Sequence, residues 1–358
     1  MPAPTTAFRP GAMQARPAAQ ALCVSLALWL SGCGDATQAP SGDGAAREAR
    51  LREIEDASDA IERLIQARRT REAELLVRKL VAAVPAERRE SRLAELAART
   101  LFARAQLDAA ELAKAERAEL VREAAAFARE AARAAPDAVR LRFAALLAGQ
   151  SGDTIGARDL YDEALAFAPD DLQALLFAAG ASLAARDAAH ARPLVARHAA
   201  LAPEDPWSAA LEAQLALLDG DTKRAVERAT EAVARDRELL EVRLVLSAAL
   251  LADARASDAA RLLAALPAET RAKVPVADAL ARALVASGDL RAAAQAWDDA
   301  RRANPTDAFV RAEAAIALLR AGEHTRAASL LDGFESLVDG MRERARVEEA
   351  VRAAPQAP

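Results

Sequence analysis

Small and apolar residues recur along this chain with a period of 34 residues. The stretch SGDTIGARDLYDEALAFAPDD (151–171) returns as SGDLRAAAQAWDDARRANPTD (287–307), four periods further on. The same small residue stands at every step of 34 through this part of the chain: Ala157, Ala191, Ala225, Ala259, Ala293 and Ala327. A fixed period of this length indicates an array of repeated structural units.

One unit, residues 138–171, shows the pattern of two helices. Its first thirteen residues, AVRLRFAALLAGQ, are apolar enough for a buried helix. Gly152 then provides a turn, and Asp153 is placed to cap a second helix. That second helix carries one apolar stripe and is stopped by Pro169. Two helices cannot bury such a stripe alone, so the units are expected to stack into a solenoid.

The unit resembles the tetratricopeptide repeat (TPR). It shares the period, the Gly-Asp turn, the small residue at the helix crossing, a closing proline, and an aromatic residue at Tyr161 and Trp297. The usual Trp and Gly-Tyr signature of the first helix is absent, and Arg237 and Arg271 replace the closing proline, so generic stacking of alanine-rich helices is the alternative. The resemblance implies an all-α fold, a right-handed superhelical solenoid of antiparallel helix pairs with about eight repeats. Six regular 34-residue units fill residues 138–341: 138–171, 172–205, 206–239, 240–273, 274–307 and 308–341.

The flanks of the regular array are less uniform. Residues 47–137 are expected to form irregular N-terminal TPR-like helices, with one repeat over about residues 52–87. The distance from Pro85 to Pro136 exceeds one period by 17 residues, so the next unit has either lengthened helices or an inserted turn. Residues 342–358 are expected to form a C-terminal capping helix and a tail.

A second helix also looks shortened within the array. Pro267 and Pro275 bracket the stretch PAETRAKVP, where a regular unit would continue its second helix. We therefore expect an irregular junction between the units 240–273 and 274–307.

Residues 1–32 have the features of a secretory signal peptide. Arg9 and Arg16 precede the short apolar run ALCVSLALWL, which ends just before Ser31, Gly32 and Cys33. This ending resembles the bacterial lipobox, and the resemblance implies that Cys33 becomes the lipidated N-terminus. An ordinary signal peptide with an accidental cysteine is the alternative. Translation could start at Met1 or at Met13, and the later start gives a signal of more typical length.

A lipid on Cys33 would place the chain in the bacterial cell envelope, facing the periplasm. Residues 33–46 would then be the lipidated cysteine and a flexible tether, since GDATQAPSGDGAA is rich in Gly, Ser, Pro and Asp. Its 13 residues reach at most about 45 Å when extended. Gly34 rather than Asp follows the cysteine, which by the same resemblance favours the outer membrane over the inner membrane. Cys23 would leave with the signal, so no disulfide is expected.

Charge and candidate chemistry narrow the function classes. The chain has a net charge of −5, and loss of the two signal arginines leaves 46 basic and 53 acidic residues, a net charge of −7. An acidic chain gives no electrostatic footprint for nucleic acid. The sequence shows no phosphate-binding loop, cysteine pair or zinc-protease motif, and His190 and His198 have no third ligand nearby in sequence. We therefore expect no catalytic site, no metal and no cofactor.

Binding of a protein or peptide is the remaining function class. In TPR solenoids the first helix of each unit lines the concave groove, and the resemblance implies a largely apolar groove suited to an apolar or amphipathic segment. The alternative is that several of these side chains pack between helices. The candidate groove residues are Val139, Arg142, Leu146, Leu176, Leu183, Trp207, Gln214, Leu217, Leu244, Leu251, Asp278, Arg282, Val285, Phe309, Ile316 and Leu319.

The sequence thus favours a lipid-anchored TPR scaffold in the assembly of a cell-envelope complex. The layout is similar to that of TPR lipoproteins in pilus assembly, secretion, outer-membrane assembly and exopolysaccharide export, and no motif chooses among these systems. The alternative is an adaptor or regulator that binds a periplasmic cell-wall hydrolase.

Overall fold

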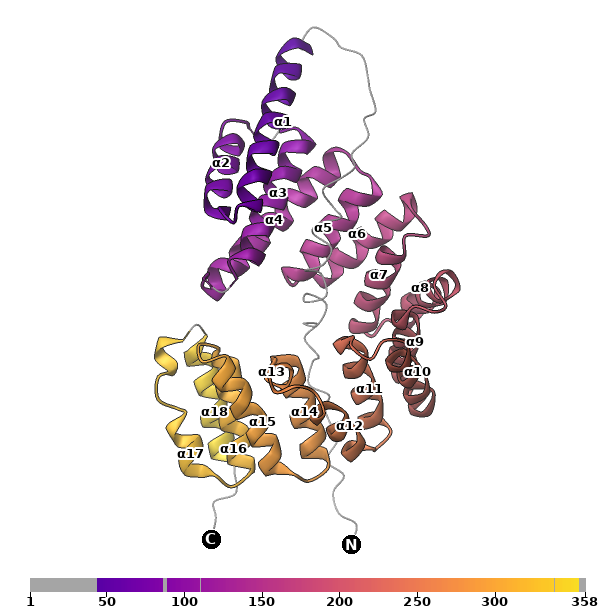
Figure 1. The fold of residues 1–358 in the computed structure, drawn as a ribbon, viewed down its shortest axis with the longest axis vertical. Helices are drawn as coiled ribbons and strands as arrows, with labels where there is room; N and C mark the ends of the chain where they lie inside the picture. Colours follow the sequence, from indigo (N-terminus) through magenta and orange to yellow (C-terminus); the bar gives the residue numbers. More distant parts are fainter. Residues whose placement is uncertain (1–43, 86–88, 110, 338, 354–358) are drawn as a thin grey trace.

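The computed structural model describes residues 44–85, 89–109, 111–337 and 339–353. Within these ranges the chain is helical and has no strands, and consecutive helices pack as antiparallel pairs around an open curve (Figure 1). None of the described helices is both long and apolar enough to cross a bilayer. The predicted signal peptide, Cys33 and most of the tether lie outside the described residues. The all-α solenoid expected from the sequence is confirmed.

In the described ranges, the helices form eight pairs and a final single helix. First helices of successive pairs pack on one another at four places, which are α1 on α3, α7 on α9, α9 on α11 and α11 on α14. In chain order the pairs are α1 (Gly44–Gln66) and α2 (Thr70–Ala82), α3 (Ser91–Leu107) and α4 (Lys114–Ala134), α5 (Ala138–Gln150) and α6 (Thr154–Phe167), α7 (Leu172–Ala184) and α8 (Ala188–Leu201), α9 (Pro206–Asp219) and α10 (Thr222–Arg235), α11 (Leu240–Ala252) and α12 (Ala256–Ala264), α14 (Val274–Ala286) and α15 (Leu290–Ala303), and α16 (Ala308–Arg320) and α17 (His324–Ser329). The short α13 (Ala268–Arg271) follows α12, and η4 (Phe334–Ser336) and α18 (Gly340–Ala353) close the array.

Aspartates cap the helices with the same 34-residue period. Their carboxylates accept hydrogen bonds from backbone N–H groups in the first turn, which have no partner within the helix. Before first helices these residues are Asp137, Asp171, Asp205 and Asp307, and before second helices they are Asp153, Asp187, Asp221 and Asp289. The unit 240–273 has no such cap, because Leu239 and Arg255 occupy the two positions.

The turn within each regular unit contains one residue in the left-handed region. It is a glycine at four of the six positions, as at Gly152 with φ 93°, where a missing side chain removes the steric cost. Arg186 and Ala254 occupy the equivalent positions with φ 60° and 58°. A residue with a Cβ costs about 1–2 kcal/mol in this conformation, so these two turns are strained.

The periodic alanines lie where the two helices of a unit cross. All six are at most 3 % exposed, from Ala157 to Ala327. The residue four positions later is the large neighbour of the crossing in three units, where Tyr161, Leu263 and Trp297 are buried. A methyl group at one position lets the backbones approach closely while the larger side chain fills the space beside it.

The N-terminal and C-terminal units differ from the regular ones. The long segment before residue 138 contains two lengthened helices, α3 of 17 and α4 of 21 residues. At the N-terminal end, α1 begins at Gly44, three residues before the boundary expected from the sequence. The second helix of the last unit, α17, has only six residues, and α18 begins at Gly340 rather than at 342. The short α12, with nine residues, lies where the two prolines predicted an interruption.

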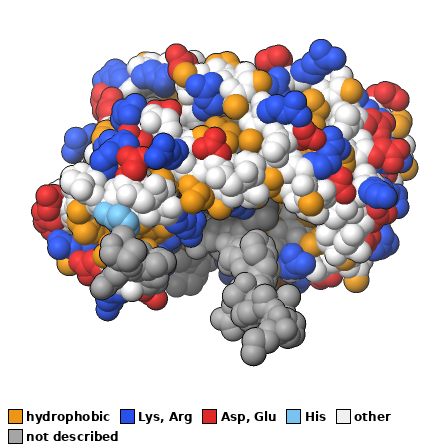
Figure 2. Space-filling model, turned by 90° about the horizontal axis from the view of Figure 1, so that it is seen from below, with side chains coloured by type: hydrophobic (Ala, Val, Ile, Leu, Met, Phe, Trp, Pro, Cys, Tyr) orange, Lys and Arg blue, Asp and Glu red, His pale blue; other side chains and the backbone are white. Residues whose placement is uncertain are grey.

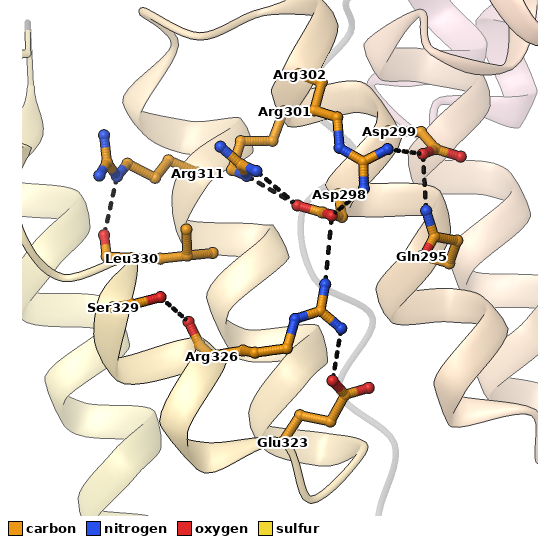
Figure 3. Close-up of polar contacts among 10 residues, drawn as sticks. All are labelled: Gln295, Asp298, Asp299, Arg301, Arg302, Arg311, Glu323, Arg326, Ser329 and Leu330. Carbon is orange, nitrogen blue, oxygen red and sulfur yellow. Dashed lines mark hydrogen bonds and ion pairs between the residues drawn. The ribbon is translucent and has the colours of Figure 1, made fainter.

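Arginines fasten the short α17 to its neighbours (Figure 3). The buried carboxylate of Asp298 in α15 accepts hydrogen bonds from Arg301 at 2.9 Å and Arg302 at 2.6 Å, and Arg326 of α17 lies 3.4 Å away. Burial alone would raise the pKa of Asp298, but these guanidinium groups outweigh it and hold the pKa below its usual value. Arg311 donates a 2.9 Å hydrogen bond to the Leu330 carbonyl. Charged hydrogen bonds thus replace part of the packing that a full-length helix would give.

Replacing Ala293 with leucine tests the helix crossing. The added carbons have no space beside the buried Trp297, so Ala293→Leu is expected to destabilise the chain by about 1–3 kcal/mol. Ala196→Leu, at an exposed position within α8, is the matched control and should change stability little. The urea midpoint of each variant measures the effect, and equal midpoints for the two would refute the close crossing at Ala293.

Candidate functional site

We call the row formed by the first helices the inner wall, and an apolar groove lies where four consecutive helices of this row meet. We call it the N-terminal groove, and its volume is about 150 Å³. The helices α1, α3, α5 and α7 form it, together with one residue of α6. Its lining is Ser58, Ile61, Glu62, Ile65, Gln66, Leu96, Arg99, Thr100, Phe102, Ala103, Arg142, Phe143, Leu146, Tyr161, Gln173 and Phe177.

Aromatic rings give the groove a rigid floor. Phe102 and Phe143 meet edge to face with ring centroids 6.3 Å apart, and Tyr161 stacks on Phe177 at 5.8 Å. Burial raises the pKa of Tyr161 far above its ordinary value, against the opposing charge of Arg142, so the phenol stays neutral. Such rings offer a large contact area and lose little conformational entropy on binding.

The carboxylate of Asp171 has two roles at the edge of the groove. One oxygen caps α7 by accepting from the backbone N–H groups of Gln173 at 3.0 Å and Ala174 at 3.1 Å. The other accepts a 2.7 Å hydrogen bond from Arg142, and both side chains of this ion pair are less than 20 % exposed. The cap therefore fixes the position of an arginine that lines the groove.

Two other charged groups face the groove without such a partner. Glu62 of α1 and Arg99 of α3 are both half-buried. Among the described residues, neither makes a hydrogen bond or an ion pair, with the other or with any neighbour. The groove thus combines apolar walls with one acidic and one basic side chain.

Two of the predicted groove residues line the N-terminal groove, and the other fourteen differ in their exposure. Arg142 and Leu146 line the N-terminal groove. Leu183 and Leu319 are buried, and they pack between helices as the alternative reading of the sequence allowed. Val139, Arg282 and Val285 are exposed, and the remaining nine are half-buried: Leu176, Trp207, Gln214, Leu217, Leu244, Leu251, Asp278, Phe309 and Ile316.

The central part of the predicted wall packs against two separate clusters. Trp207 rests on small residues of α9 and α10 and on Val242 of α11. Leu217, Leu244 and Leu251 pack against the next cluster, between α9 and α14. None of these four residues lines the N-terminal groove, and contact between them and a ligand stays a prediction.

Sequence reasoning missed the contribution of α1 and α3. These helices supply ten of the sixteen lining residues, yet they lie before the regular array, where the period gave no register. The signal available was aromatic content: the chain has only twelve aromatic residues, and Phe102, Phe143, Tyr161 and Phe177 all line this groove.

The two histidines of α8 form hydrogen bonds with serines of the neighbouring helices α7 and α9. His190 Nδ1 lies 2.7 Å from Ser182 Oγ, and His198 Nδ1 lies 2.8 Å from Ser208 Oγ. Burial lowers the pKa of His198, against the weaker opposing charge of Asp205. In the described part of the chain, no group of three or more His, Cys, Asp or Glu residues is arranged to hold a metal ion.

The described residues on one face of the molecule carry charges of both signs. On the face shown in Figure 2, Lys and Arg alternate with Asp and Glu, and apolar side chains are scattered among them. Intermixed charges of this kind are typical of solvated helix faces rather than of a surface for a polyanion.

Solved structures show the same fold. Yeast Tom70 superposes with a TM-score of 0.56 and 16 % identity over 80 % of this chain, which spans 58 % of the Tom70 chain. A tetratricopeptide repeat protein from Parabacteroides merdae superposes with a TM-score of 0.58 and 11 % identity, covering 75 % of this chain and 99 % of its own. This chain has the TPR fold. At these identities the likeness extends to the fold alone, and no protein-family model and no curated protein matches the sequence.

Substitutions at Asp171 separate its cap from its ion pair. Asp171→Asn keeps an oxygen for the cap but loses the charge that holds Arg142, so we expect a loss of about 1 kcal/mol. Asp171→Ala loses both and should cost about 2–3 kcal/mol. Asp289→Ala, which removes the cap of α15, is the control for a cap alone. Urea denaturation measures all three, and equal losses for Asp171→Ala and Asp289→Ala would contradict a stabilising ion pair.

Proposed function

We propose that this chain is a scaffold that binds an apolar or amphipathic segment of a partner protein in the N-terminal groove. The observation that supports the proposal is the concave apolar lining, to which four consecutive first helices contribute. A preformed concave surface with aromatic walls and few polar groups is typical of a binding site. Repetition of the unit extends such a surface along the inner wall.

The chemistry of the lining favours binding over catalysis. It includes no histidine or cysteine, and its phenol is held neutral by burial. A general base or an activated nucleophile requires a titratable group within hydrogen-bond reach of its partner. Within the described part of the chain, the charged groups of Glu62 and Arg99 make no such contact with each other or with a neighbour.

We further propose that the scaffold is anchored in the bacterial cell envelope by a lipid on Cys33. The support is the sequence alone: the basic start, the short apolar run, and Leu30 to Cys33. The scaffold would face the periplasm, with the outer membrane favoured, and would serve the assembly of a cell-envelope complex. In that arrangement, the short tether keeps α1, and with it the groove, within tens of ångströms of the membrane.

A charge placed in the groove should weaken partner capture. Leu146→Glu puts a carboxylate on the apolar lining, and we expect at least a tenfold loss of affinity, because an incoming apolar segment cannot solvate it. The matched control is Ile155→Glu, because Ile155 is 68 % exposed on α6 and lies outside the groove. Immobilised wild-type and variant chains are compared for the envelope proteins they retain, and circular dichroism monitors their helix content. Equal retention by wild type and Leu146→Glu would exclude the groove as the binding surface.

Removal of the cysteine thiol tests the anchor. Cys33→Ala should prevent incorporation of the lipid, because the thiol is the only group at this position that can form the thioether. Cells expressing either form are labelled with a clickable fatty acid, and the purified chains are compared. Equal labelling of wild type and Cys33→Ala would eliminate lipidation at this residue.

A further inference from the structure

The arginines of the inner wall differ in how their charge is neutralised. Arg142 is held by Asp171 at 2.7 Å, and Arg282, further along the solenoid, pairs with Asp278. Arg99 lines the N-terminal groove and, within the described residues, has neither a hydrogen bond nor an ion pair. Glu62, on the adjacent helix α1, is in the same situation.

Both groups lie among apolar side chains. Ile61 and Ile65 flank Glu62 on α1, and Leu96 and Phe102 accompany Arg99 on α3. Both side chains are half-buried, so solvent water can reach their charges through the groove. An apolar segment that fills the groove removes this water, and a buried charge without a counter-ion is strongly unfavourable. The charges therefore penalise a purely apolar ligand and favour one that supplies their opposites.

We infer that the N-terminal groove selects a partner segment with one acidic side chain opposite Arg99 and one basic side chain opposite Glu62, beside apolar anchors. The inference rests on the proposed function, because it concerns the ligand of the same groove. The segment is part of a protein rather than a free anion or a lipid headgroup, because most of the lining requires apolar side chains.

The order of the helices gives the bound segment a direction. Glu62 lies on α1, Arg99 on α3, and the apolar side chains of Leu146 and Phe177 on α5 and α7. A segment that crosses the first helices therefore meets a carboxylate, then a guanidinium group, then an apolar surface. Lining residues lie on both sides of Arg99, on α1 and on α5. A segment bound along the groove therefore extends past Arg99 in both directions, so the acidic group opposite Arg99 is a side chain within the segment rather than a chain terminus.

Four synthetic peptides test the inference on the purified chain. Each is a 15-residue amphipathic helix with leucine and phenylalanine along one face. Two positions of that face carry Glu and Lys, Glu and Gln, Gln and Lys, or Gln and Gln. Fluorescence anisotropy gives the Kd of each peptide for wild type, Arg99→Gln and Glu62→Gln, and circular dichroism checks the fold.

The two variants serve as controls for each other. For wild type we expect Glu to tighten binding about tenfold over Gln, and Lys to do so by a smaller factor, since charge-assisted hydrogen bonds are stronger than neutral ones. Arg99→Gln should abolish the preference for Glu and keep that for Lys, and Glu62→Gln should do the reverse. Arg282→Gln, outside the groove, should keep both. Arg99→Lys, which preserves the charge, should keep the preference for Glu if Arg99→Gln proves unstable.

The outcomes separate this inference from the function on which it rests. If all four peptides bind wild type equally, the groove binds apolar segments and the charge selection is wrong. If the preference for Glu persists in Arg99→Gln, another cation is responsible and the inference is also wrong. If no peptide binds, the proposed use of the groove fails together with the inference.

Discussion

The close crossing of two helices at a buried alanine is the contact on which the rest of the structure depends. A buried alanine stands at this position in six consecutive units, and in three of them Tyr161, Leu263 or Trp297 fills the space beside it. Because every crossing has a similar geometry, each pair stacks on the previous one in a similar way. The continuous inner wall is a consequence of this regularity.

The binding surface lies where the regularity ends. One part of the N-terminal groove belongs to α5, α6 and α7 of the regular array, and the other part belongs to α1 and α3. The helices α1 and α3 have 23 and 17 residues, whereas first helices of the regular units have 13 or 14. The lining residues of these two helices lie within 58–66 of α1 and 96–103 of α3, so the site depends on how two irregular units pack against regular ones rather than on the repeat itself.

The sequence predicted the features that each repeat determines locally. It did not predict the groove, because the groove depends on contacts between units. The alanines, the Gly-Asp turns and the aspartate caps are local features, so the pattern around Asp153 predicts the helices that flank it. The groove is different, because Arg99 and Leu146 come from separate units whose relative register was not fixed by the period. The sequence left open whether Leu183 and Leu319 face the groove or pack between helices, because residues at equivalent positions of successive units meet different neighbours, and both are buried. The shortened α17 depends on a cluster around Asp298 that no repeat consensus contains.

The unit 240–273 lacks three stabilising features that occur in the units beside it. It has no aspartate cap on either helix, its turn places Ala254 at φ 58°, and its second helix has only nine residues. In a solenoid each unit touches only its neighbours, so the free energy of unfolding is close to a sum of unit and interface contributions. A weak unit in the interior therefore divides the array into two blocks that can lose structure separately. The block before it contains the N-terminal groove, so a tensile load on the C-terminal block would open the chain at this unit first and leave the groove folded.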